Sequence, residues 1–261
     1  MKKTPPRILS IAGSDCSGGA GIQADIKAIT VCGGYASTAI TALTAQNTQG
    51  VFGIHEIPNG FIAQQIDLIL SDIGADIIKT GMLCNREIIE TISYILEGYS
   101  QIPMVIDPVM ISTSGSTLLD PKAIESLKEL LIARALVVTP NIPEAEVLYG
   151  KEINSEDDVQ AAAEYIKKLG AANVIIKGGH FGGGNVRDSL LSDDGFKFFT
   201  SKRIETNNTH GTGCSFASAL STFIAKGISI ENSVQKAHDF VHNAILTAPD
   251  LGKGCGPINF I

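Results

Sequence analysis

Residues 207–214 read Asn-Asn-Thr-His-Gly-Thr-Gly-Cys, and a helical apolar pattern begins directly after them at Phe216 and Leu220. Gly211 and Gly213 can adopt positive φ angles and let another group approach the backbone closely. The first turn of the following helix has unpaired N–H groups and the positive end of the helix dipole. These features predict a site for an anion, such as a phosphoryl group in transfer. A glycine turn without any ligand would explain the same residues, so the rest of the chain has to decide.

Cys214 stands at the start of this helix, on the rim of the predicted anion site. The helix dipole and the N–H donors favour the thiolate, while burial disfavours it. Since the sequence shows no charged partner, we expect a modest lowering of the thiol pKa from its ~8.5 reference value. A small apolar cysteine that only packs is the alternative interpretation.

The chain has 261 residues, enough to bury a sizeable core. It carries 20 Lys and Arg against 27 Asp and Glu, which gives a net charge of -7. This balance, without a basic cluster, argues against binding to nucleic acid or to an anionic membrane surface. Five cysteines without C-x-x-C spacing predict free thiols in a reducing compartment. Because no segment approaches the ~18 apolar residues of a membrane span, we expect a soluble protein of the cytoplasm.

Short apolar segments alternate with helical patterns along the chain. Strands are predicted over residues 8–12, 36–43, 76–79, 104–106, 135–138 and 173–176, with a hairpin over residues 189–199. Helices are predicted from about residue 22, over residues 58–73, 86–96, 121–131 and 155–169, and as two closing helices. Unbroken apolar strands between helices are typical of a mostly parallel α/β sheet covered on both faces. Without a linker or repeat, residues 1–261 are interpreted as a single domain.

Polar or glycine-rich groups follow each of these strands. They are Gly13-Ser14-Asp15, Gln46 with Asn47, residues 79–82, Asp107, Asn141 and Lys177. In an open parallel sheet, ligands bind outside the carboxyl ends of the strands. Any single group could be an ordinary loop residue, but six such strand ends on one edge predict a shared site.

Asn141 is followed three residues later by Glu144, and this spacing is typical of an N-terminal capping box. Taken alone, the pair favours that structural role. Asp107 at a neighbouring strand end gives Glu144 a second interpretation, because two carboxylates near a nucleotide could hold Mg²⁺ directly or through water.

Two common nucleotide motifs do not fit the glycine loop after the first strand. Gly13 and Gly18 imitate the start of a P-loop, but Gly19-Ala20 follows instead of Lys-Ser/Thr. Residues 19–24 imitate a dinucleotide fingerprint, yet no acidic residue stands between Asp25 and Glu56, where that fingerprint requires one. A dehydrogenase is therefore disfavoured.

Asp25 lies one turn into the first helix, where it is either a solvated helix carboxylate or an acceptor that points back at the glycine loop. Gln46 can donate and accept hydrogen bonds together, which suits the edge of a heteroaromatic ring. Neither residue is decisive alone.

Seven motifs stand at residues 12–25, 41–48, 79–83, 107–110, 139–145, 177–180 and 208–214. In this order they resemble the hydroxymethylpyrimidine/phosphomethylpyrimidine kinases of thiamine biosynthesis, within the ribokinase superfamily. The resemblance covers nearly the whole chain and implies a ribokinase-like three-layer sandwich. It implies ATP-dependent phosphorylation of 4-amino-5-hydroxymethyl-2-methylpyrimidine and then of its monophosphate. Since relatives are dimers, it also implies a homodimer.

The same resemblance implies a role for each matching residue. Those it places around the pyrimidine are Gln46, Asp25, Gly13, Met82 and Val109. Those it places with the ATP phosphates and Mg²⁺ are Asp107, Asn141, Glu144, Lys177 and Thr209, with Asp107 and Glu144 at the metal. It implies that Gly211, Thr212 and Gly213 form an anion hole beside Cys214, which takes the place of the aspartate base of sugar kinases.

The chain departs from the family pattern at two places. Residues 111–116 read Ile-Ser-Thr-Ser-Gly-Ser where relatives often have Ala-Lys-Ser-Gly-Asp, so flap contacts are not carried over. Phe260 stands where His is usual.

Three other functions remain open at this point. Pyridoxal kinase activity is the nearest, because pyridoxine also carries a hydroxymethyl group on a nitrogen ring. Gln46, and Cys214 in place of aspartate, argue against a sugar or nucleoside kinase. The retained Asp107, Glu144 and Lys177 argue against a pyrimidine-binding protein without turnover.

Overall fold

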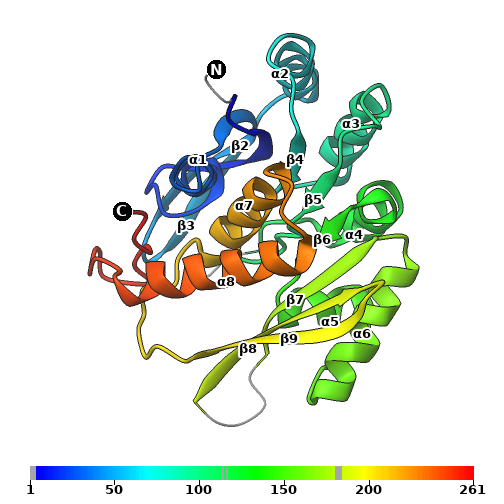
Figure 1. Ribbon diagram of the computed structural model, residues 1–261. Coiled ribbons are helices and arrows are strands. Elements are labelled where there is room, and N and C mark those ends of the chain that lie inside the picture. The colour runs from blue at the N-terminus through cyan, green and yellow to red at the C-terminus, as the bar shows by residue number, and fades with distance from the viewer. Residues whose placement is uncertain (1–3, 113–114, 116, 180–183) are drawn as a thin grey trace.

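One nine-stranded sheet runs through the described part of the chain (Figure 1). The structure is a computed structural model that describes residues 4–112, 115, 117–179 and 184–261. The strands are β1 (Arg7–Asp15), β2 (Tyr35–Asn47), β3 (Gly50–Glu56), β4 (Ile77–Thr80), β5 (Met104–Ile106), β6 (Val137–Val138), β7 (Asn173–Gly179), β8 (Asn185–Ser192) and β9 (Gly195–Lys202). Their order across the sheet is β3-β2-β1-β4-β5-β6-β7-β8-β9.

The centre of the sheet is parallel and both edges are antiparallel. β2, β1, β4, β5, β6 and β7 pair in parallel, whereas β3 pairs antiparallel with β2 and the β8–β9 hairpin pairs antiparallel with β7. The carboxyl ends of six neighbouring strands therefore reach the same edge. The predicted mostly parallel sheet is confirmed.

Helices cover the sheet on both faces. They are α1 (Gly21–Val31), α2 (Asn59–Asp72), α3 (Arg86–Glu97), α5 (Ile142–Tyr149), α6 (Glu156–Lys168), α7 (Thr212–Ala225) and α8 (Ile230–Leu246). Residues 121–134, predicted as one helix up to residue 131, form a succession of short 3₁₀, α and π turns: η1 (Pro121–Ala123), α4 (Ile124–Ser126), η2 (Leu127–Leu131) and η3 (Ile132–Arg134).

Alternate residues of the buried strands enter two separate cores. Ile78 and Ile106 pack with apolar residues of α2, α3, α5 and α6, while their neighbours Ile77 and Val105 pack against α7 and α8. Because side chains along a strand point to opposite faces, a strand apolar at every position must be covered twice. Figure 1 shows α1, α7 and α8 together on one face of the sheet. The expected three-layer arrangement is confirmed.

Several boundaries differ from the sequence predictions. β2 continues to Asn47 and pairs with β3, an edge strand that was not predicted. The hairpin turns near Asp194-Gly195 as expected, but its strands are longer than residues 189–199. In the part of the chain that the structure describes, no helix is long and apolar enough to cross a membrane. Residues 113, 114 and 116 of the flap motif, and His180, lie outside the described residues.

Candidate active site

A cavity of about 670 Å³ lies at the carboxyl ends of the parallel strands. It is lined by residues from β1, β2 and β7, from the segments after β4, β5 and β6, and from the first turn of α7. The predicted site residues among its lining are Gly13, Gln46, Met82, Asp107, Val109, Asn141, Glu144, Lys177, Thr209, Gly211, Thr212, Gly213 and Cys214. The structure thus brings together all of the predicted site residues except Asp25.

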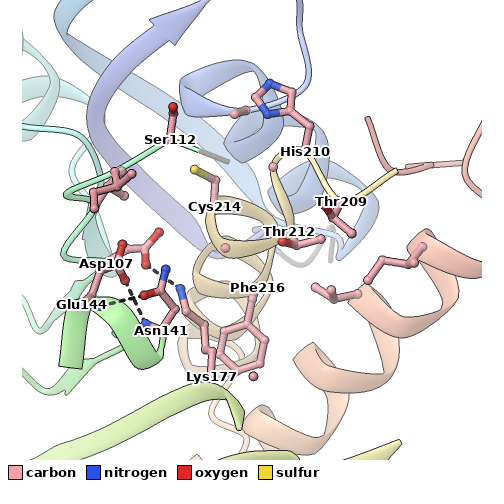
Figure 2. Close-up of a pocket in the computed structure, with 18 of the residues that line it drawn as sticks. Asp107, Ser112, Asn141, Glu144, Lys177, Thr209, His210, Thr212, Cys214 and Phe216 are labelled. Atoms are coloured by element: carbon pink, nitrogen blue, oxygen red, sulfur yellow. Dashed lines mark hydrogen bonds and ion pairs between the residues drawn. The ribbon is translucent and has the colours of Figure 1, made fainter. Parts of the chain in front are cut away.

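The glycine turn before α7 can be built only with glycine at Gly211. Gly211 has a φ of 84° and stands at the N-cap of the helix. A Cβ at this position would lie 1.8 Å from the carbonyl oxygen of Gly19, so any side chain would collide with the loop after β1. The close contact holds the start of α7 against that loop, with its first N–H groups at the cavity (Figure 2).

Lys177 and Asp107 face this helix start from β7 and from the end of β5. Lys177 Nζ donates to Asp107 Oδ1 over 2.8 Å, and Thr139 Oγ1 donates to the same oxygen over 3.1 Å. A Cβ at Gly213 would lie 3.2 Å from Lys177 Nζ and 3.9 Å from Asp107 Oδ2. Among the residues that the structure describes, the buried Asp107 Oδ2 has no hydrogen-bond partner.

Glu144 serves as a helix cap beside this ion pair. Asn141 Oδ1 accepts from the Glu144 N–H over 2.9 Å, and Glu144 Oε2 accepts from the Asn141 N–H over 2.8 Å, which completes a capping box. The structural interpretation of this pair is therefore confirmed. Burial raises the pKa of Glu144 to about 7; the Lys177 ammonium opposes this rise, and the Asp107 carboxylate adds to it.

Burial also dominates the ionisation of Cys214. The half-buried side chain extends from the first turn of α7 between His210 and Ser112 (Figure 2). Burial raises the pKa of the thiol to about 11; the Lys79 ammonium and the Gly21 N–H lower it, while Asp25 and Asp107 raise it further. The expected modest lowering is therefore wrong. The carboxylates come from distant parts of the sequence, and desolvation outweighs the helix start.

Asp25 does not line the cavity, so its predicted place around the pyrimidine stays a prediction without support from the cavity lining. Its side chain is fully buried in an ion pair with Lys79, at 2.9 Å and 3.0 Å from Nζ to the two carboxylate oxygens. Ser10 Oγ and Ser218 Oγ donate to the same carboxylate over 2.6 Å and 2.7 Å. With four hydrogen bonds from three donor groups of β1, β4 and α7, the carboxylate has no free direction toward a ligand.

The cavity also contains a histidine, His210, to which the sequence analysis gave no role. His210 Nε2 lies 2.8 Å from Asp15 Oδ2 and 3.2 Å from the Gln46 side-chain nitrogen. Gly13 and Met82 line the same cavity and lie against each other, since a Cβ at Gly13 would be 3.1 Å from Met82 Sδ. His210 stands inside the glycine motif, so its position was available in the sequence, although its partners were not.

A family model described as phosphomethylpyrimidine kinase matches residues 15–259. The chain belongs to the phosphomethylpyrimidine kinase family. It is 46% identical over 254 residues to the hydroxymethylpyrimidine/phosphomethylpyrimidine kinase of Bacillus subtilis, with 97% of this chain and 94% of that protein covered. It is 48% identical over 254 residues to the thiamine biosynthesis bifunctional protein ThiED of Geobacter sulfurreducens. That match covers 97% of this chain but only 52% of ThiED, so the chain spans about half of that longer protein.

The fold of this phosphomethylpyrimidine kinase family member is also that of a solved kinase. An ADP complex of Bacillus subtilis pyridoxal kinase superposes with a TM-score of 0.91 at 35% identity, with 98% of each chain covered. The ribokinase-like fold expected from the sequence is thereby confirmed.

A second group missed by sequence reasoning lines the cavity of this family member on the side of α8. His238 Nδ1 lies 2.7 Å from Asp188 Oδ2, and the Gly178 N–H donates to Asp188 Oδ1 over 2.8 Å. Burial alone would lower the pKa of His238, but Asp188 raises it above its ordinary value. Phe216, Val241 and Ile245 add an apolar surface beside this pair. The two polar residues are fifty positions apart, and no local motif marks them.

Proposed function

We propose that this protein is a kinase that phosphorylates 4-amino-5-hydroxymethyl-2-methylpyrimidine with ATP and then phosphorylates the monophosphate to the diphosphate, in thiamine biosynthesis. The observation that carries the proposal is one cavity with two chemically different ends. At one end, the first turn of α7 meets Lys177 and Asp107; at the other, Gln46 offers an amide suited to a heteroaromatic edge. Phosphoryl transfer requires mainly such positioning and charge stabilisation.

The phosphoryl end would act through backbone N–H groups and one ammonium. The first turn of α7, from Thr212 to Cys214, would donate to the oxygens of the transferring group, as an anion hole does. Lys177 would neutralise the charge that develops on them. Burial by itself lowers the pKa of Lys177, but Asp107 and Glu144 raise it above its ordinary value, so its charge is kept. Asn141 and Thr209, which also line the cavity, would contact the nucleotide.

Asp107 and Glu144 fit a Mg²⁺ ion. Asp107 Oδ2 is a buried carboxylate oxygen without a hydrogen-bond partner among the described residues, and a hard cation is what such an oxygen binds best. Glu144 adds a second carboxyl group close by. When bound, Mg²⁺ would neutralise phosphate charge.

Cys214 would accept the proton of the substrate hydroxyl during the first phosphorylation. Because the thiol pKa is about 11, only a small fraction of the enzyme has the thiolate at neutral pH. The N–H groups and Lys177 would then carry most of the transition-state stabilisation. The second phosphorylation needs this base less, since a phosphate oxygen loses its proton easily.

The pyrimidine end would bind the ring between apolar surfaces and form hydrogen bonds with the polar edge of the ring. Gly13, Met82 and Val109 would contact the ring, and Gln46 would pair with a ring nitrogen and the neighbouring exocyclic amine. An analogue without these groups would leave the amide unpaired, which costs about 1–3 kcal/mol per buried group.

Phosphorylation of pyridoxal is the second candidate, favoured by the structural likeness to Bacillus subtilis pyridoxal kinase. The two functions are separated by kcat/KM values for the pyrimidine alcohol, its monophosphate, pyridoxal and pyridoxine, measured with ATP and Mg²⁺. The proposal requires the two pyrimidines to have the highest values. A preference for pyridoxal over the pyrimidine alcohol would favour the second candidate.

We further propose that residues 1–261 act as one kinase domain in a homodimer in the cytoplasm. The single sheet supports the first part. Exposed apolar residues on the edge formed by β2 and β3, namely Leu43, Phe52 and Ile54, support pairing with a second copy. Light scattering after size exclusion would test the dimer, and a monomer at micromolar concentration would contradict it.

A further inference from the structure

The side-chain amide of Gln46 lies between two polar groups, one on each side. In the structure, Thr44 Oγ1 is 3.1 Å from Gln46 Oε1, and His210 Nε2 is 3.2 Å from the Gln46 side-chain nitrogen. Both neighbours are buried, whereas Gln46 itself is half-buried and lines the cavity. The hydrogen-bonding needs of the two neighbours therefore decide which end of the amide is oxygen and which is nitrogen.

Asp15 fixes the proton of His210. The Asp15 carboxylate accepts from Ser17 and from the Ala20 N–H, and its Oδ2 lies 2.8 Å from His210 Nε2. Burial by itself raises the pKa of Asp15, but the hydrogen bonds from His210, Ser17 and Ala20 lower it to about 2. An ionised carboxylate can only accept, so His210 must hold a hydrogen on Nε2.

A hydrogen on His210 Nε2 has a direct consequence for Gln46. This single hydrogen is directed at Asp15 and can be shared with an acceptor 3.2 Å away, whereas an NH₂ group at that position would place two donors against each other. The hydrogen-bond network therefore favours the amide turned over from its orientation in the structure, with the Gln46 oxygen toward His210 and the NH₂ group toward Thr44. Nitrogen and oxygen of an amide have nearly the same shape, so this assignment follows from the network of hydrogen bonds.

Thr44 leads to the same orientation independently. Its Oγ1 lies 3.0 Å from the Ser14 carbonyl oxygen and 3.1 Å from Gln46. A hydroxyl has a single hydrogen, which would have to be shared between two acceptors if the Gln46 oxygen faced Thr44. With the Gln46 NH₂ group on its side, Thr44 donates to Ser14 and accepts from Gln46, so every partner is satisfied.

We propose that His210 is a positioning residue that fixes the amide of Gln46 and thereby determines which heteroaromatic edge the site accepts. One lone pair of the Gln46 oxygen and one hydrogen of its nitrogen remain for a ligand. The hydrogen of the Gln46 nitrogen can be donated to a ring nitrogen of the ligand. The lone pair of the Gln46 oxygen can accept from an exocyclic amine next to that ring nitrogen, with the amine on the His210 side. This inference rests on the proposed function, because it describes how that same site selects its pyrimidine.

The test compares two substrates whose edges are reversed. One is 4-amino-5-hydroxymethyl-2-methylpyrimidine, and the other is its 4-oxo analogue, in which a carbonyl replaces the amine and the adjacent ring nitrogen carries a hydrogen. For the unmodified protein we expect the ratio of kcat/KM values to favour the amine by about 10² or more, as in sites built to pair with polar groups. His210→Leu frees the amide to turn over, so the ratio should fall by at least about 10-fold.

His210→Gln is the conservative variant, because its amide nitrogen can replace the Nε2–H donor, and it should keep the ratio within about 3-fold of the unmodified protein. Thr44→Val removes the other partner with almost no change in shape and should lower the ratio as His210→Leu does. Thr44→Val carries the test if His210→Leu does not fold. His55→Leu, the same exchange at an exposed position on β3, is the control and should leave the ratio unchanged.

A merely structural role of His210 would lower the melting temperature or kcat for both substrates and leave their ratio unchanged, and that result would overturn the inference. An unmodified protein that phosphorylates neither pyrimidine would overturn the proposed function as well. Activity on the amine together with an unchanged ratio in His210→Leu and Thr44→Val would overturn the role of His210 alone.

Discussion

Lys177 and Asp107 share a hydrogen bond of 2.8 Å, and the second oxygen of the same carboxylate, Oδ2, has no partner among the described residues. One carboxylate thus holds the cation of β7 in place while it keeps a free acceptor beside the first turn of α7. This arrangement would allow Asp107 to orient Lys177 and to bind a metal ion at the same time.

Replacement of Asp107 should affect the use of MgATP more than the binding of the pyrimidine. Asp107→Asn keeps the shape but removes the charge, so we expect the Mg²⁺ concentration for half-maximal rate to rise at least about 10-fold. The apparent KM for the pyrimidine should change little. Thr139→Val, which removes only the neutral hydrogen bond to Asp107 Oδ1, is the matched control. Equal losses for pyrimidine and MgATP would argue against a role at the metal.

Glu144 should influence both the stability of the protein and its pH dependence. Its pKa is raised from 4.5 to about 7, so the folded state binds this proton more tightly than the unfolded state. The free energy of unfolding should therefore fall as the pH rises from about 4.5 to 7. Glu144→Gln can keep the capping box and should flatten this dependence in urea unfolding measured at several pH values.

Glu144→Ala, compared with Glu144→Gln, distinguishes the helix-capping role of Glu144 from a role at the metal ion. Loss of the capping box should lower the free energy of unfolding by about 0.5–2 kcal/mol. If Glu144 also contacts Mg²⁺, Glu144→Ala and Glu144→Gln should both weaken the use of MgATP. Normal turnover in both variants would show that Glu144 acts only as part of the capping box and not at the metal ion.

Cys214 should ionise only at high pH. Because its pKa is about 11, the rate of alkylation by iodoacetamide should rise about tenfold per pH unit from pH 7 to 10, without a plateau. The exposed Cys16 is the reference thiol within the same sample. The kcat of the first phosphorylation should rise with pH in parallel, and Cys214→Ser should lose about 10²–10⁴ in kcat. A plateau in alkylation near pH 8, or a Cys214→Ser enzyme with normal kcat, would contradict this role.

The buried ion pair of Asp25 and Lys79 should support the fold and leave pyrimidine affinity unaffected. Asp25→Asn leaves the Lys79 ammonium without its charged partner and should destabilise the protein by about 3–5 kcal/mol. Ser218→Ala, which removes one donor to the same carboxylate, should cost only about 1 kcal/mol. Asp25→Leu combined with Lys79→Met should recover much of the loss. A large rise in the KM for the pyrimidine at normal stability would contradict the assignment.

The sequence predicted the parallel centre of the sheet well because its short inner strands β5 and β6 are buried at every position and apolar throughout. β3 was not predicted, since Gly50–Glu56 contains two glycines and is mostly exposed. Residues 121–134 have a helical apolar pattern, but periodicity does not distinguish α from 3₁₀ or π turns.

The site residues also divide into those that the topology predicts and those whose environment depends on distant parts of the chain. Gly13, Asp107 and Lys177 stand at strand ends, so topology alone brought them together. The environment of Asp25 could not be predicted, because its partner Lys79 is 54 positions away. The sequence alone does not distinguish a buried carboxylate on a helix from an exposed one. The raised pKa of Cys214 was missed for the same reason, since it depends on burial and on charges from other elements.

The central claim is that one cavity phosphorylates the pyrimidine alcohol twice. The most direct measurement is mass spectrometry of the products after incubation of the purified protein with ATP, Mg²⁺ and 4-amino-5-hydroxymethyl-2-methylpyrimidine. We expect the monophosphate to appear first and to be converted into the diphosphate, with both products absent when Lys177→Ala replaces the unmodified protein. The absence of both phosphates from a folded, nucleotide-binding protein that phosphorylates pyridoxal instead would contradict the claim.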